Sequence, residues 1–200
     1  MMEYIRKGQV ATKMNIEAIA FRRIQWGLLF FIDYAPRGID LLPDIVGLAL
    51  VFSGVKGLVS VSDRFLLAKR VCIPLIVLAL YELVQPMVLG GVNPEVRAWI
   101  GVIRSIAETG LNITLVTFMC SGLRQYALSR DWGSIAHMAR RRSLYFTVAL
   151  ACSFSMIGFA LASPMVFSAM AAPMFLLYII VVFMLMGLFG QAAKMVQKQK

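Results

Sequence analysis

Six apolar blocks follow one another along the chain, and short segments that hold most of the charged residues separate them. The blocks cover residues 24–35, 41–59, 71–89, 99–119, 144–162 and 166–189. The last four each have 19 or more residues, enough for a helix to cross a hydrocarbon core of about 30 Å. They lack the period-two alternation of a barrel strand, and open strands would leave backbone groups unsatisfied in lipid. The pattern predicts an all-α membrane helix bundle with about six transmembrane helices.

The first block is too short to cross alone, because 12 residues make only about 18 Å of helix. Either it recruits residues beyond its ends, or the first two blocks form a re-entrant hairpin that turns at 36–38. We favour six crossings over four crossings and a hairpin. Residues 1–23 are expected to be a basic tail or a short interfacial helix, residues 24–190 the membrane domain, and residues 191–200 a second basic tail.

The basic residues are distributed very unevenly among the connections. Seventeen of the 20 Lys and Arg residues lie in the two tails, in the segment between blocks two and three with its edges, or between blocks four and five. The alternate connections hold only Arg37 and Arg97. Because positive residues favour the cytoplasmic side, both termini are predicted to be cytoplasmic.

Composition supports a membrane location and weakens other classes. Hydrophobic residues make up 60% of the chain, charged residues 15%, and the mean hydropathy is +0.79. A soluble domain of this size has too little interior to bury that much apolar surface. The net charge of +10 comes from residues between apolar blocks, not from a basic stripe, so nucleic acid is not an expected partner. The expected partners are the lipid bilayer and its anionic headgroups, with a homo-oligomer left open.

Chemical motifs are scarce. His137 is the only histidine, and Cys72, Cys120 and Cys152 lie in or beside apolar blocks as small fillers. There is no phosphate loop, no paired-histidine zinc motif and no nucleophile elbow. We therefore expect no metal, no cofactor and no enzymatic activity.

The turn between the first two blocks gathers an outer acidic group made of Asp33, Asp40 and Asp44, close to Arg37. Pro43 suits a first helical position, and Asp44 then lies at the positive end of the helix. The group would either capture a cation or form a capped helix start, and we favour the second.

The stretch 27–58 carries a resemblance to a known group. Centred on Leu42-Pro43-Asp44-Ile45-Val46-Gly47, with Gly54 and Gly57 following, it resembles a group of small multipass membrane proteins of Gram-positive bacteria that have no assigned activity. The resemblance implies a bacterial cytoplasmic membrane and no particular activity.

A polar cluster is predicted inside the membrane. Its members are Glu82 and Gln85 in the third block and Arg104, Glu108 and Asn112 in the fourth. The last three are four residues apart, so they share one helix face. Glu82 and Arg104 are each eleven residues from Asn93, which places both about 16 Å from the turn. Equal depth and opposite charge predict a pair, with Glu108 as a competing partner. Ionisable residues at this depth indicate either a solute path or polar contacts between helices.

Two further features concern packing and lipid contact. Small residues at Ala151, Ser155, Gly158 and Ala162, and at Gly47 and Gly54, predict close helix contacts. The triplet Arg140, Arg141 and Arg142 precedes 51 uncharged residues, 143–193, and is expected to contact anionic headgroups.

Two functions follow from these features. We expect a non-enzymatic accessory or structural component of the membrane. The alternative is a small-solute or ion transporter or channel that uses Glu82, Arg104, Glu108 and Asn112. A hydrated cavity lined by these four residues would favour transport.

Overall fold

The computed structural model describes the backbone of residues 2–31, 44–88, 91, 93–162 and 164–199, and the side chains within 14–31, 45–85, 91, 93–155, 165 and 169–199. These residues form six α-helices and no strand. The helices are α1 (Met2–Leu29), α2 (Asp44–Leu58), α3 (Asp63–Val88), α4 (Pro94–Leu128), α5 (Gly133–Ala162) and α6 (Pro164–Lys198). The all-α expectation is confirmed.

Most of the helices extend beyond the apolar blocks that predicted them. α1 occupies the expected N-terminal tail and ends at Leu29, well before residue 35. Directly after it, the Phe30 and Phe31 N–H groups donate hydrogen bonds to the carbonyls three residues earlier. α5 begins at Gly133, so the arginine triplet lies inside the helix. Hydropathy marks only the apolar part of a helix. Once nucleated, the helix continues through Lys, Arg, Gln and Met, which are good helix formers.

Local contacts explain where α4 begins and where it ends. At its start, the Asn93 side chain accepts a hydrogen bond of 3.0 Å from the Glu95 N–H, and Pro94 occupies the first turn. At its end, Asp131 adopts a positive φ of 58°, and the Trp132 N–H returns to the Ala127 carbonyl at 2.8 Å. This compact turn makes α4 and α5 antiparallel neighbours.

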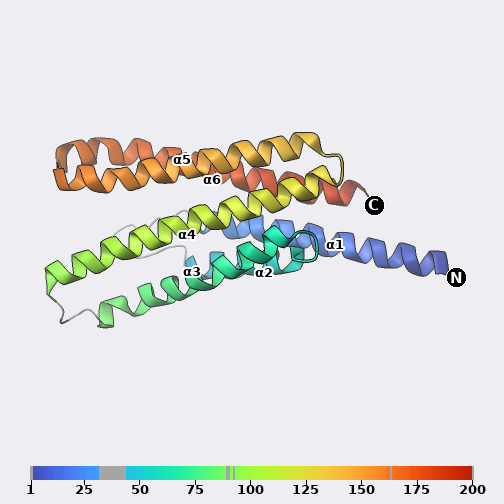
Figure 1. Cartoon of the computed structure of the whole chain (residues 1–200), viewed down its shortest axis with the longest axis horizontal. Coiled ribbons are helices and arrows are strands. Elements are labelled where there is room, and N and C mark those ends of the chain that lie inside the picture. Colours follow the sequence, from blue (N-terminus) through green and yellow to red (C-terminus); the bar gives the residue numbers. More distant parts are fainter. Residues whose placement is uncertain (1, 32–43, 89–90, 92, 163, 200) are drawn as a thin grey trace.

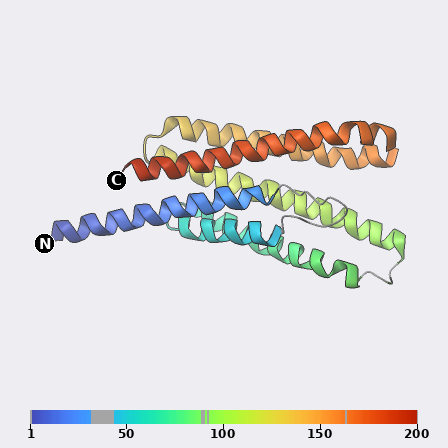
Figure 2. The same cartoon turned by 180° about the vertical axis from the view of Figure 1, so that it is seen from behind.

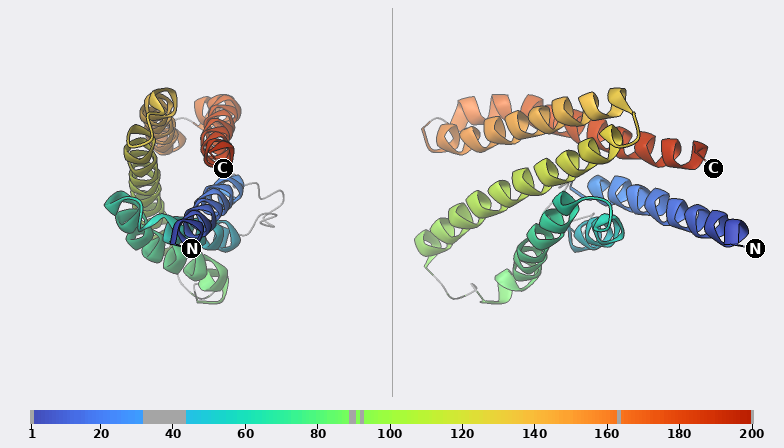
Figure 3. Two further views of the ribbon diagram at one scale, coloured as in Figure 1. Left: turned by 90° about the vertical axis from the view of Figure 1, so that its right-hand side faces the viewer. Right: turned by 45° about the vertical axis from the view of Figure 1, so that its right-hand side comes forward.

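The six helices form a closed ring. Each packs against its neighbours in sequence, and α1 packs against α6. Both termini therefore lie at one end of the molecule, together with the α2–α3 and α4–α5 connections (Figures 1 and 2). At the opposite end, the α3–α4 hairpin diverges from the α5–α6 hairpin (Figure 3).

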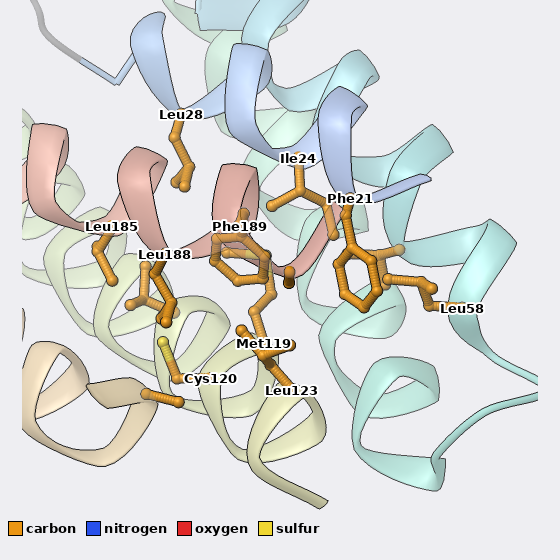
Figure 4. Close-up of a cluster of buried hydrophobic side chains, with 14 of the residues drawn as sticks. Phe21, Ile24, Leu28, Leu58, Met119, Cys120, Leu123, Leu185, Leu188 and Phe189 are labelled. Atoms are coloured by element: carbon orange, nitrogen blue, oxygen red, sulfur yellow. The ribbon is translucent and has the colours of Figure 1, made fainter. Parts of the chain in front are cut away.

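The buried core lies in the half of the ring nearer the termini. Figure 4 shows side chains from α1, α2, α4 and α6 meeting there, including Phe21, Leu58, Leu123 and Phe189. The Phe21 ring lies 5.6 Å from Tyr126 and 6.4 Å from Phe189 between centroids. The core thus closes the ring at this end.

Two predicted packing glycines bring α1 and α2 together. A Cβ on Gly54 would lie 2.6 Å from the Ala20 carbonyl oxygen, and a Cβ on Gly47 would approach the Phe30 side chain even more closely. Only glycine permits this approach. The small-residue ridge on α5 is different, since Ala151 and Ser155 are exposed. The packed face of α5 instead carries the larger Phe146, while 158 and 162 lie outside the described side chains.

Within the described part of the chain, two helical segments are long and apolar enough to span a membrane, Pro94–Leu128 and Ala169–Lys198, so the favoured six crossings stay a prediction. The apolar blocks of α3 and α5 end among residues whose side chains are not described. Large apolar side chains are exposed along α3, α4 and α6, among them Leu83 (65%), Ile103 (65%) and Phe183 (53%). Exposed apolar surface of this kind marks a face that contacts lipid or another protein.

Candidate functional site

The predicted pair between α3 and α4 is present. Arg104 Nη2 lies 2.9 Å from Glu82 Oε1, and Arg104 Nη1 donates a hydrogen bond of 3.0 Å to Gln85 Oε1. Glu82 and Gln85 are one helical turn apart, so both face α4. One guanidinium thus holds two side chains of the neighbouring helix.

A cleft of about 440 Å³ lies where the two hairpins diverge. Its wall includes Glu82, Arg104, Glu108 and Asn112, the four residues that sequence analysis connected with transport. Further polar groups come from Ser105, Thr109, Ser153 and Tyr178, and apolar surface from Phe31, Leu150, Ala171, Met174 and Phe175. The cleft is therefore lined by α3, α4, α5, α6 and the end of α1.

Helix periodicity explains why α4 supplies most of the polar wall. Arg104, Glu108 and Asn112 recur every four residues, and Ser105 and Thr109 extend the same face. The opposite face carries Ile103 and Ile106, which are exposed to the surroundings of the ring. α4 thus separates a polar interior from an apolar exterior.

The pair is accessible to water from the cleft. The Glu82 side chain is 48% exposed and that of Arg104 is 21% exposed. An ion pair at this exposure is screened and contributes little to stability. Its arrangement therefore leaves the charges available to a solute.

Two buried polar atoms on this wall have no hydrogen-bond partner. They are Arg104 Nε, a donor, and Asn112 Oδ1, an acceptor. Beside Asn112 lies a second chamber of about 20 Å³, bordered also by Glu82 and Glu108. This volume is about that of one water molecule.

The inner end of the cleft is closed by packing. Leu115, Val116 and Met119 follow Asn112 on α4 and are fully buried. On the α6 side, the Tyr178 hydroxyl donates a hydrogen bond of 2.7 Å to the Phe31 carbonyl, which ties α6 to the end of α1. Packing thus closes the cleft on the side of the termini.

A second polar cluster, not singled out from the sequence, lies at the closed end. Glu17 is 3% exposed, and among the described side chains no other charged residue is buried. The Tyr126 hydroxyl donates a hydrogen bond of 2.7 Å to Glu17 Oε2, and Arg130 Nη2 lies 3.6 Å from the same oxygen. Arg130 also donates to Gln199 Oε1 at 2.7 Å, so α1, α4 and α6 are joined. A signal existed, because Glu17 shares a helix face with the buried Met14 and Phe21.

The arginine triplet is divided. Arg140 and Arg141 are exposed, whereas Arg142 lies between α5 and α6 and donates a hydrogen bond to the Met184 carbonyl. Sequence spacing could not separate them, because the direction of each side chain depends on where α6 packs.

The outer acidic group is only partly visible. Asp33 and Asp40 lie outside the described residues, and Asp44 is the first residue of α2. Among the described side chains, no three His, Cys, Asp or Glu residues gather as a metal site. Cys72 and Cys120 are buried and Cys152 is exposed, all as free thiols.

No protein-family model, curated protein or solved structure matches this chain.

Proposed function

We propose that the chain is a multipass protein of the bacterial cytoplasmic membrane that binds a small polar solute in the cleft and transports it across the bilayer. The convergence of Glu82, Arg104, Glu108 and Asn112 on one cleft of about 440 Å³ carries the proposal. Ionisable groups at membrane depth are costly, and a water-filled solute path is their usual reason. Of the two functions expected from the sequence, transport is the one that this cleft supports.

The shape of the ring supports a transport cycle. The cleft is open at the end away from the termini, and the apolar core together with the Glu17–Tyr126 contact closes the other end. A transporter exposes its central site to one side at a time, usually by rocking helix bundles against each other. The α3–α4 and α5–α6 hairpins, which diverge at the open end, are the bodies expected to move (Figure 3).

Several features support the membrane placement and orientation. Apolar side chains are exposed on the outer faces of α3, α4 and α6, and two helical segments are long enough to span the bilayer. The end that holds both termini also holds the α2–α3 and α4–α5 connections, where most of the Lys and Arg residues lie. Positive residues favour the cytoplasm, so the cleft would open to the outside.

The chemistry of the wall indicates a polar or zwitterionic solute. The Arg104 guanidinium offers positive charge, and the carboxylates of Glu82 and Glu108 offer negative charge on the wall of the same cleft. Phe31, Met174 and Phe175 add apolar and aromatic surface. A ligand with both signs of charge and a small apolar part matches this mixture.

The test is uptake by the full-length protein in liposomes of bacterial polar lipids. A defined mixture of amino acids, small amines and monosaccharides is added, and mass spectrometry measures what accumulates. We expect at least one solute to exceed its level in empty liposomes. Glu108→Gln should slow its uptake about tenfold, the effect of losing one charge-assisted contact. Glu95→Gln, at the exposed start of α4, is the matched control and should leave uptake unchanged.

The accessory role is the second candidate, and the outer face of α4 favours it. Val96, Trp99, Ile103 and Ile106 expose a continuous apolar strip that suits packing against a helix of another membrane protein. If folded wild-type protein takes up none of these solutes, the transport proposal fails and the accessory role is preferred. If uptake occurs but Glu95→Gln reduces it as much as Glu108→Gln, the cleft is not the solute path.

A further inference from the structure

A groove of about 480 Å³ lies between α4 and α5, near the end of the molecule that holds the termini. Its wall carries His137, Arg140 and Arg141 from α5, with hydroxyls from Thr117 on α4 and from Ser143 and Thr147 on α5. None of the residues that line it is acidic. A groove with this wall attracts an anion and offers hydrogen-bond donors around it.

The groove has a polar end and an apolar end. His137, Arg140 and Arg141 come just before the 51 uncharged residues 143–193 begin. Leu144 and Val148 continue the same face of α5 toward the membrane interior and are 60% and 51% exposed. A phospholipid has this gradient, since a charged headgroup is followed by acyl chains.

The arginines of the triplet differ in their availability. Arg142 is engaged by the Met184 carbonyl of α6, so its guanidinium is directed away from the groove. Arg141 is positioned by Tyr145, whose hydroxyl accepts hydrogen bonds of 3.2 and 2.7 Å from its Nε and Nη2. Arg140 is exposed. Two of the three arginines are thus presented at the polar end.

We propose that this groove binds one phospholipid of the cytoplasmic leaflet through its anionic headgroup. His137, Arg140 and Arg141 contact the phosphate, Thr117 and Ser143 donate hydrogen bonds to it, and an acyl chain follows Leu144 and Val148. Basic pockets between membrane helices on the cytoplasmic side are suited to such headgroups. The inference rests on the membrane placement proposed above and is independent of the solute cleft.

Native mass spectrometry of the full-length protein in a non-ionic detergent measures lipid binding directly. We expect one molecule of dioleoylphosphatidylglycerol to bind to each chain, with higher affinity than dioleoylphosphatidylcholine. Arg140→Gln combined with Arg141→Gln should weaken binding of the anionic lipid about tenfold. The matched control, Arg64→Gln combined with Arg70→Gln, removes two exposed charges from α3 and should change binding less than about twofold.

A third variant separates the groove from its charge. Thr117→Trp keeps every cation and fills the groove from an exposed position, so it should also weaken anionic-lipid binding. Thermal unfolding of each variant checks that it is folded. If the Arg140→Gln, Arg141→Gln variant and the α3 control lose equal affinity for the anionic lipid, the proposal is overturned. The lipid would then be attracted by the charge of the whole basic end and not by the groove.

Two further measurements are needed. The first distinguishes a lipid phosphate from a free phosphate ion, and the second tests the membrane placement separately from the lipid site. Sodium phosphate should not compete with the lipid at equal concentration, and competition would show a soluble-anion site instead. Flotation with vesicles of either lipid tests membrane insertion alone. Protein that floats with both vesicles but shows no preference in mass spectrometry contradicts the lipid site and leaves the membrane placement intact. Protein that floats with neither contradicts both.

Discussion

At the scale of single residues, the Glu82–Arg104 pair determines how the cleft presents its charge. The two side chains meet at 2.9 Å from adjacent helices, at the equal depth that their distance from Asn93 predicted. Because the cleft admits water, the pair adds less stability than a dry pair would. Its main effect is to orient the Arg104 guanidinium, which also donates a hydrogen bond to Gln85.

Exchanging the charges of this pair tests the contact. Glu82→Ala and Arg104→Ala should each lower stability in detergent by at most about 1 kcal/mol, which is at most a shift of about 2–4 °C in Tm. Glu82→Arg combined with Arg104→Glu should recover most of the loss, since the pair is restored in reverse. If the exchange is no better than either single change, and Glu108→Ala is equally damaging, Arg104 depends on Glu108 instead.

The buried Glu17 carboxylate depends on the Tyr126 hydroxyl. Tyr126→Phe removes the donor of a 2.7 Å hydrogen bond and leaves a buried oxygen with less compensation. The expected cost is about 1–3 kcal/mol, or about 2–4 °C in Tm for each kcal/mol.

The control is Tyr145→Phe, which removes a hydroxyl that binds Arg141 at the exposed surface. It should change Tm by no more than about 1–2 °C. Similar shifts for the two variants would show that the Glu17 contact contributes nothing specific to stability.

At the scale of elements, the tight contact between α1 and α2 depends on glycine. A Cβ on Gly54 would lie 2.6 Å from the Ala20 carbonyl, which belongs to helix backbone and cannot move aside cheaply. Gly54→Ala should therefore lower stability by about 1–3 kcal/mol, the usual result of overpacking. Thermal unfolding in detergent measures it.

Gly101→Ala is the matched control on α4, because nothing lies within 4 Å of its added Cβ. There the methyl group should stabilise the helix by up to about 1 kcal/mol through helix propensity. Two variants that shift Tm in the same direction would contradict the close approach of α1 and α2.

At the scale of the whole molecule, the α3–α4 and α4–α5 connections lie at opposite ends of the ring (Figure 1). Asn93 directly precedes α4, and Ser134 lies in the first turn of α5. Both residues are exposed. With the exposed Cys152 replaced by serine, Asn93→Cys should react with an impermeant thiol reagent in intact cells, and Ser134→Cys should react only after lysis. Labelling of Ser134→Cys from outside would reverse the proposed orientation.

Much of the helical plan follows from local properties of the sequence. Six apolar blocks predict six helices, the Asn93-Pro94 pair begins α4, and equal distance from the turn brings Glu82 to Arg104. Gly47 and Gly54 also contribute to close packing, as expected. Each of these depends on residues within one helix or one hairpin, where chain geometry fixes the relation between positions.

Contacts between distant segments were decided by tertiary structure alone. Glu17 meets Tyr126 across 109 positions of sequence, and Arg142 binds the carbonyl of Met184 rather than solvent or lipid. On α5, small size at Ala151 and Ser155 predicted a contact, yet both are exposed because the neighbouring helices pack against another face. The closure of α1 against α6 and the divergence of the two hairpins create the cleft. Periodicity shows which residues share a face, but only the packing of six helices decides what that face meets.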